Sequence, residues 1–204
     1  MAFLPFSERA KRWEPVALEL RGMAGAEREV LLDPWKLAEK VGLRVFEDIA
    51  GLVGLPDDDK IHLLKSARYD WSAGIYPTPL PDGTFLCILN PSHTRERQKI
   101  SLMEEIAHRH FGHEPSRITL SGDGLCIRDF SREDEAEAYG VGAAALLPWV
   151  TFFPVLNVGR TIEELTEIYD VTTELIEYRI KITGAFRLYQ ARQRVQRTTG
   201  AARL

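Results

Sequence analysis

MEEIAHRHFGH, residues 103–113, combines a helical pattern with a cluster of glutamate and histidine. Apolar residues recur at intervals of three and four through this segment and just before it: Ile100, Met103, Ala107 and Phe111. This spacing is typical of one face of an α-helix, and we expect the helix to run from Arg95 to Phe111. Gly112 is expected to end it, because glycine is the residue most often found just past a helix C-terminus.

Glu104 and His108 are four positions apart, which on a helix places them about 40° from the same face, so that both can bind one ion. Glu105 is the next position and lies beside them, in position to polarise a water molecule. This is the arrangement of the H-E-x-x-H helix of metallopeptidases, in which two histidines bind zinc and the glutamate is the general base. In this chain Glu104 replaces the first histidine.

A catalytic zinc site has three protein ligands and one open position, so a third ligand must come from another part of the chain. The next predicted helix begins after Ser131, which forms a capping-box pattern with Asp134, and it ends at Leu147. Its first turns are acidic and are the natural source of the third ligand: Glu133, Glu135 and Glu137. Alanine and glycine dominate the rest of this helix, which allows it to approach a neighbour closely.

The chain before this cluster predicts a short helix and a small sheet. A helix is expected to begin at Asp33-Pro34 and to end at Gly42. Three segments have strand character: LRVFEDI (43–49), SAGIY (72–76) and TFLCIL (84–89). We therefore expect a mainly helical α+β fold with a small sheet of about three strands beside the glutamate–histidine helix.

Less regular patterns lie between these elements. Residues 57–60 are predicted to form a charged turn, and residues 118–130 (ITLSGDGLCIRDF) a loop or a short hairpin. No residue from 138 to 159 is charged, but glycines and prolines interrupt this segment. It is therefore better explained by a buried helix ending near Pro148, followed by an irregular apolar stretch, than by a transmembrane helix.

The order of these elements resembles the ImmA/IrrE-type family of bacterial and phage metallopeptidases. In that family a strand ending in asparagine leads through an arginine-containing stretch into the motif helix, as Leu89-Asn90 does here through residues 95–98. The family's second helix carries a glutamate ligand in the form E-A-N-x-F-A and ends in L-L-M-P. Here Glu137-Ala138-Tyr139 and Leu146-Leu147-Pro148 occupy those places. The likeness extends from Pro34 to Ile182.

The resemblance implies a zincin-like domain in which Glu104, His108 and Glu137 bind the metal and Glu105 is the general base. It implies zinc as the cofactor. Two carboxylate ligands shift the preference toward manganese or another divalent ion, and a site that has lost its metal is the remaining alternative. Tyr139 stands where the family has a small polar residue.

Two functions are compatible with this resemblance. In the first, the protein is a metal-dependent endopeptidase that hydrolyses a peptide bond in a regulatory protein such as a transcriptional repressor. In the second, it is a catalytically inactive zincin-fold module that binds a protein partner. The family likeness favours the first, whereas Glu104 favours the second, because two carboxylates neutralise a divalent ion and make it a weaker Lewis acid.

Three further histidines accompany the motif. His110 is two positions from His108 and is expected to face away from it. His113 is predicted to interact with the helix terminus, and folding back to the site as a substitute ligand or hydrogen-bond donor is the alternative. His93 lies in the loop before the helix. Met103 and Phe111 are predicted to be core residues.

The predicted organisation has three parts. We expect the zincin-like metallopeptidase domain at residues 1–158, a helix-turn-helix-like segment packed on it at residues 159–190, and a basic tail, disordered or in contact with an acidic partner, at residues 191–204. The second helix of the middle segment sets Glu174 and Glu177 against two basic residues, and such a helix is poorly suited to approach DNA phosphates.

The amino-acid composition limits the class of protein and the compartment in which it is expected. The 204 residues are 45% hydrophobic and 27% charged, which is enough apolar material for a single core. A net charge of −4 argues against a general nucleic-acid or anionic-membrane binder. The two cysteines, Cys87 and Cys126, show no paired-ligand spacing and make a disulfide scaffold improbable. A reducing cytoplasm is therefore the expected compartment.

Overall fold

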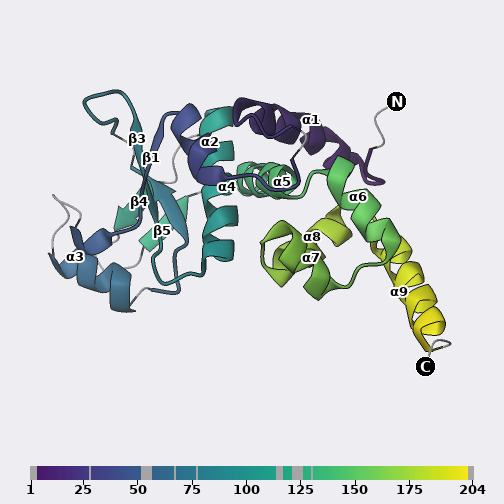
Figure 1. Cartoon of the computed structure of the whole chain (residues 1–204). Coiled ribbons are helices and arrows are strands. Elements are labelled where there is room, and N and C mark those ends of the chain that lie inside the picture. The colour runs from purple at the N-terminus through teal and green to yellow at the C-terminus, as the bar shows by residue number, and fades with distance from the viewer. Residues whose placement is uncertain are drawn as a thin grey trace. The chain divides into compact units, whose positions relative to one another are not determined.

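The computed structural model describes residues 4–27, 29–51, 57–66, 68–76, 78–113, 117–120, 126–129 and 131–201. The chain divides into two compact units, one of residues 34–139 and one that combines residues 1–33 with residues 140–204 (Figure 1). This division differs from the predicted boundaries at residues 158 and 190, because the N-terminal helix belongs with the C-terminal helices. The predicted α+β class with a three-stranded sheet is confirmed.

The unit of residues 34–139 contains a mixed three-stranded sheet in the order β1-β3-β2. Strand β1 (Leu43–Phe46) is parallel to β3 (Phe85–Leu89), with Leu43 opposite Phe85. Strand β2 (Ala73–Ile75) is antiparallel to β3. Cys87 and Leu89 of β3 are fully buried and alternate with partly exposed residues, as expected for a strand with one covered face.

Two helices accompany this sheet. Helix α2 (Pro34–Lys40) contacts β1, and α4 (Arg95–Phe111) contacts β2, β3 and α2 (Figure 1). Helix α4 has the predicted bounds. The side chain of Thr94 caps its first turn, and Gly112 ends it in the left-handed conformation, with φ of 68°. The predicted apolar face of α4 is buried at Ile100, Met103 and Ala107.

In two segments of this unit, the structure differs from the prediction or decides between two predicted alternatives. Residues 57–61 form a short helix, α3 (Asp57–Ile61), that continues into a π-helical turn (His62–Ser66), where a charged turn was expected. Its first turn carries the ion pair between Asp57 and Lys60 at 3.2 Å, and acidic residues at a helix N-terminus favour helix formation. Strands β4 (Arg117–Leu120) and β5 (Cys126–Asp129) form an antiparallel hairpin, one of the two structures expected for that segment.

The second unit consists of helices. They are α1 (Glu8–Met23), α6 (Trp149–Val158), α7 (Ile162–Tyr169), α8 (Thr173–Ile182) and α9 (Phe186–Ala201), together with the second half of α5 (Arg132–Leu146). Helices α7 and α8 confirm the predicted pair of short helices. Thr161 and Glu164 form the capping box before α7, and Asp170 makes the left-handed turn that ends it.

A buried polar network organises this helical unit. Glu14, Arg21 and Arg179 are all at most 3% exposed. Arg179 donates to the carboxylate of Glu14 and to the carbonyl of Leu147. The other oxygen of Glu14 accepts the backbone N–H of Trp149 at 3.0 Å. Because this carboxylate satisfies the first N–H of α6, residues 149–158 form a helix, and the predicted irregular stretch is wrong.

One further segment agrees with its sequence pattern, and another differs from one expectation. A Cβ atom at Gly140 of α5 would lie 2.4 Å from the ring of Trp13, so the small residues of α5 allow a close approach to α1. Residues 191–201, for which disorder was one expectation, continue α9. Arg192 anchors this helix by donating to the side chain of Asn157 at 2.8 Å.

None of the described helices alone has both the length and the hydropathy that crossing a bilayer requires. Helices α5 and α6 meet these criteria only when taken together, and they are bent by 65° at the break between them.

Candidate metal centre

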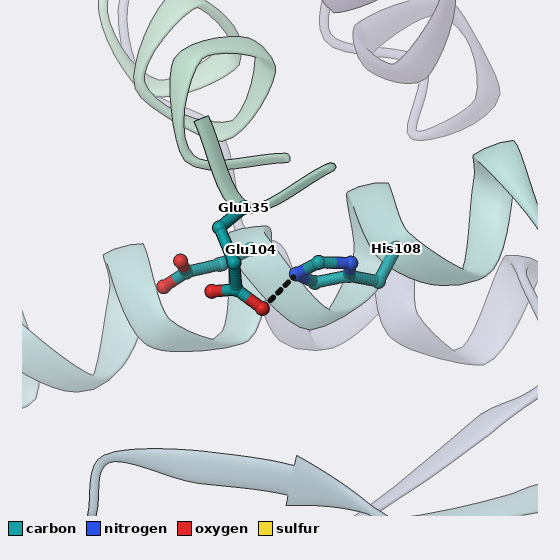
Figure 2. A group of neighbouring side chains, drawn as sticks. All are labelled: Glu104, His108 and Glu135. Atoms are coloured by element: carbon teal, nitrogen blue, oxygen red, sulfur yellow. Dashed lines mark ion pairs between the residues drawn. The ribbon is translucent and has the colours of Figure 1, made fainter. Parts of the chain in front are cut away.

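Two helices bring three potential ligands together. Glu104 and His108 project from neighbouring turns of α4, and Glu135 enters from the first turn of α5 (Figure 2). One ligand atom from each of these residues lies within 4.8 Å of the other two. Among the described residues, this is the group of histidine and carboxylate side chains that could hold a metal ion. The structure therefore brings Glu104 and His108 together, as the motif helix predicts.

The third member of the group is Glu135, whereas the resemblance places Glu137 there. The carboxylate of Glu137 lies 3.6 Å from Nε2 of His113 and outside the group. Two residues separated by two positions point about 200° apart around a helix, so α5 can direct only one of Glu135 and Glu137 toward His108. The sequence narrows the choice to three acidic residues of this helix. The selection among them depends on how α5 meets α4, which no local pattern records.

Burial and a like charge act on Glu104. Burial raises the pKa of its carboxyl from 4.5 to about 7, the negative charge of Glu135 contributes to the rise, and Arg97 opposes it. Without a cation, the carboxyl of Glu104 therefore keeps its proton to a much higher pH than an ordinary glutamate does. A divalent ion bound between Glu104 and Glu135 would remove the repulsion that helps to keep this proton in place.

His108 has the opposite shift, which suits a metal ligand. Its side chain is 18% exposed, and burial, followed by the proximity of His113, lowers the pKa of the imidazole to about 4. His108 is therefore neutral at pH 7, and its Nε2 lies 3.6 Å from Oε1 of Glu135 (Figure 2). Metals bind neutral imidazole, so no proton has to leave His108 when an ion binds.

Glu105, the predicted general base, does not belong to this three-residue group. Its carboxylate is close enough to Cys87 of β3 to add to the rise in the pKa of that thiol, which burial mainly causes. Cys87 is fully buried and stays protonated at neutral pH, so it is not a ligand candidate. The catalytic role of Glu105 stays a prediction.

His113 folds back onto the motif helix. Its Nδ1 lies 3.0 Å from Nδ1 of His108, and the ring of Phe111 stacks on it at 5.2 Å. The backbone N–H of His113 also donates to the carbonyl of His108 at the end of α4, so His113 interacts with the helix terminus as predicted and, in addition, folds its ring back onto His108. Phe111 supports the His113 ring and is partly exposed, whereas the sequence predicts only a core residue. His110 packs beside Phe111, outside the ligand group.

The donor set fits a divalent ion. Two carboxylates and one imidazole supply three ligands and carry enough negative charge to neutralise such an ion. Oxygen-rich sites shift preference from zinc toward manganese or magnesium, so the identity of the ion is not fixed by these residues.

Comparison with known families gives a match that spans these residues. The model of the Peptidase_M78 family, described as the IrrE N-terminal-like domain, matches residues 66–181. The matched segment contains all three members of the ligand group, all of α7 and all of α8 except its last residue. Comparison with curated proteins gives no match.

Proposed function

The chain belongs to the Peptidase_M78 (IrrE N-terminal-like) family, and from this premise we propose that it is a divalent-metal-dependent endopeptidase. The observation that supports the proposal is the convergence of Glu104 and His108 of α4 with Glu135 of α5, whose ligand atoms lie within 4.8 Å of one another inside the matched segment. A metallopeptidase of this type needs three protein ligands, and this group supplies them.

Each residue has a distinct task in this proposal. Glu104, His108 and Glu135 hold the ion. When bound, such an ion polarises the scissile carbonyl and makes a water molecule more acidic. Glu105 accepts a proton from the attacking water and delivers it to the leaving amine.

We propose a regulatory protein, such as a transcriptional repressor, as the substrate, which rests on the family resemblance. The helix pair α7–α8 supports a protein target more than DNA. On α8, Glu174 and Glu177 are exposed, whereas Arg179 is fully buried against Glu14. An exposed acidic face repels phosphates.

A second function is favoured by one observation. Glu104 occupies the place of a neutral histidine, and two carboxylates leave a bound ion a weaker Lewis acid. A chain that binds a partner without cleaving it is therefore the alternative, and a cleavage assay separates the two.

The test uses the full chain loaded with Mn²⁺ or Zn²⁺ and a peptide library prepared from a bacterial proteome. New N-termini are counted by mass spectrometry for the parent, for the parent with EDTA, and for Glu105→Gln. We expect new termini only with the metal-loaded parent, while Glu105→Gln keeps its metal. Equal cleavage by the parent and Glu105→Gln would contradict the proposal, and metal binding without cleavage would favour the binding module.

A further inference from the structure

The end of α4 places His113 over His108 through a defined backbone turn. Gly112 adopts the left-handed conformation, its N–H donates to the carbonyl of Arg109, and the N–H of His113 donates to the carbonyl of His108 at 3.0 Å. This is the hydrogen-bond pattern of a Schellman motif, in which the side chains of these first and last residues commonly touch. Here the two residues are His108 and His113, and their rings meet edge to face at 5.1 Å.

The surroundings of His113 hold its ring in one orientation. Phe111 stacks on one face of it, and the side chain is only 11% exposed. Its Nδ1 contacts Nδ1 of His108 at 3.0 Å. Its Nε2 points to two carboxylates of α5, with Glu137 at 3.6 Å and Asp134 at 3.8 Å.

These contacts bear on which nitrogens carry hydrogen. Carboxylates at neutral pH attract N–H groups and cannot donate. Two of them face Nε2 of His113 and one faces Nε2 of His108, so we place the hydrogen of a neutral His113 on Nε2. Its Nδ1 is then an acceptor, and the short contact requires His108 to donate from Nδ1. Nε2 of His108 is left with a lone pair directed toward the group that contains Glu135.

We propose that His113 is a positioning residue that fixes the tautomer and ring orientation of His108, with Glu137 and Asp134 behind it, so that Nε2 of His108 faces the ligand group. Glu137, expected from the sequence to bind the ion, thus acts on the site through His113. Partners of this kind orient metal-binding histidines and typically contribute about 10–100-fold to metal affinity. The part that concerns metal affinity rests on the proposed function, whereas the tautomer does not.

Two substitutions separate hydrogen bonding from packing. His113→Phe keeps an aromatic ring against Phe111 but has no acceptor for Nδ1 of His108. His113→Gln offers a carbonyl that can accept from His108 and an amide that can donate to the carboxylates. His110→Phe is the matched control, because it makes the same change three residues earlier, in the last turn of α4 and outside the ligand group.

The first measurement is the ¹⁵N spectrum of histidine-labelled, metal-free full chain at neutral pH. We expect His108 to carry its hydrogen on Nδ1 in the parent and in His110→Phe. In His113→Phe it should move to Nε2, from which it can donate to Glu135, and His113→Gln should restore the parent pattern. A parent in which His108 carries hydrogen on Nε2 would overturn the proposal.

The second measurement is calorimetric titration of the same four proteins with Zn²⁺. We expect His113→Phe to bind about 10–100-fold more weakly than the parent, with most of the loss recovered in His113→Gln. Unchanged affinity in His113→Phe would overturn the proposal. If the parent binds neither Zn²⁺ nor Mn²⁺, the proposed function fails, and the tautomer measurement on the metal-free protein still decides the role of His113.

Discussion

Glu104 sets the chemistry of the ligand group, because it brings a second carboxylate into a place where a histidine is expected. Its pKa of about 7 arises mainly from burial and then from the charge of Glu135. An ion that binds here competes with a proton for Glu104, whereas His108 is already neutral. Competition with this proton lowers the affinity of the three ligands for a metal ion at neutral pH.

Replacement of this carboxylate should change the metal preference. Glu104→His supplies a neutral imidazole in place of a group that has to lose a proton, and imidazole favours zinc over manganese. We expect zinc to bind at least about 10-fold more tightly at pH 7, and the preference for zinc over manganese to increase. Calorimetric titration with each ion measures both effects. Zinc affinity equal to that of the parent would place Glu104 outside the ligand shell.

The same carboxyl should make the stability of the metal-free protein depend on pH. Its folded pKa lies above the ordinary value of 4.5, so its contribution to stability is fully present below about pH 4.5 and is lost as the pH rises through about 7. His108 acts in the opposite sense, because its lowered pKa costs stability as the pH falls from 6.5 toward 4. The two contributions oppose each other. The effect of Glu104 is therefore measured as the difference in unfolding free energy between a Glu104 variant and the parent at each pH.

Glu104→Gln isolates the first contribution, because it removes the buried charge and keeps the shape. In EDTA we expect this variant to be more stable than the parent by about 1–3 kcal/mol at pH 8 and to gain little at pH 4.5. Urea unfolding at the two pH values measures the difference. The exposed control Glu133→Gln should gain nothing at either pH. A gain of the same size at pH 4.5 would show that burial of the charge is not the cause.

At the scale of elements, the short turn after α4 places a side chain directly against the metal-ligand group. The left-handed Gly112 directs His113 back over His108, and Phe111 supports the ring. A glycine and a histidine just past the motif helix are the sequence signal for this turn. A glycine followed by a histidine is also compatible with an ordinary helix end, so the sequence alone does not predict the contact between His113 and His108.

Gly112→Ala tests this turn against a matched position. Alanine is strained at a φ of 68°, and no atom within 4 Å would otherwise hinder its Cβ. Gly25→Ala introduces the same strain at a φ of 70°, also in open space, after α1. We expect both variants to lose about 1 kcal/mol of unfolding free energy and only Gly112→Ala to lose metal affinity. Equal metal affinity in the two variants would show that the turn does not position His113.

At the scale of the whole chain, α1 is joined to distant helices by contacts that local sequence patterns do not predict. The buried carboxylate of Glu14 joins Arg179 of α8 to the first N–H of α6, across more than a hundred positions of sequence. This network explains why residues 1–33 belong with residues 140–204. It also explains why a segment that looks irregular in sequence forms α6.

Glu14→Gln should destabilise the helical unit strongly. Glutamine can still accept the N–H of Trp149, but it leaves the buried guanidinium of Arg179 without a counter-charge, which typically costs about 3–5 kcal/mol. Glu8→Gln on the same helix removes only an exposed pair with Lys11 and should cost less than about 1 kcal/mol. Chemical denaturation of both variants measures the contrast. Similar losses would show that the buried pair has no special weight.

Features that depend on neighbouring residues could be predicted from the sequence, whereas features that depend on contacts between distant segments could not. The bounds of α4 and the three strands follow from apolar spacing and from breakers such as Gly112, which are local signals. Glu104 and His108 follow from helical geometry for the same reason. The selection of Glu135 and the capping of α6 by Glu14 depend on contacts between distant segments, which one sequence does not record.

The most direct test of the metal site is a calorimetric titration of Mn²⁺ and Zn²⁺ into the metal-free full chain. The parent should bind one ion per chain, and Glu135→Gln should weaken that binding by at least about 10-fold, because it removes a charged ligand. Glu133→Gln removes the same charge from an exposed position of the same helix and should leave the affinity unchanged. A parent that binds no ion, or a loss in Glu133→Gln as large as that in Glu135→Gln, would contradict the site described here.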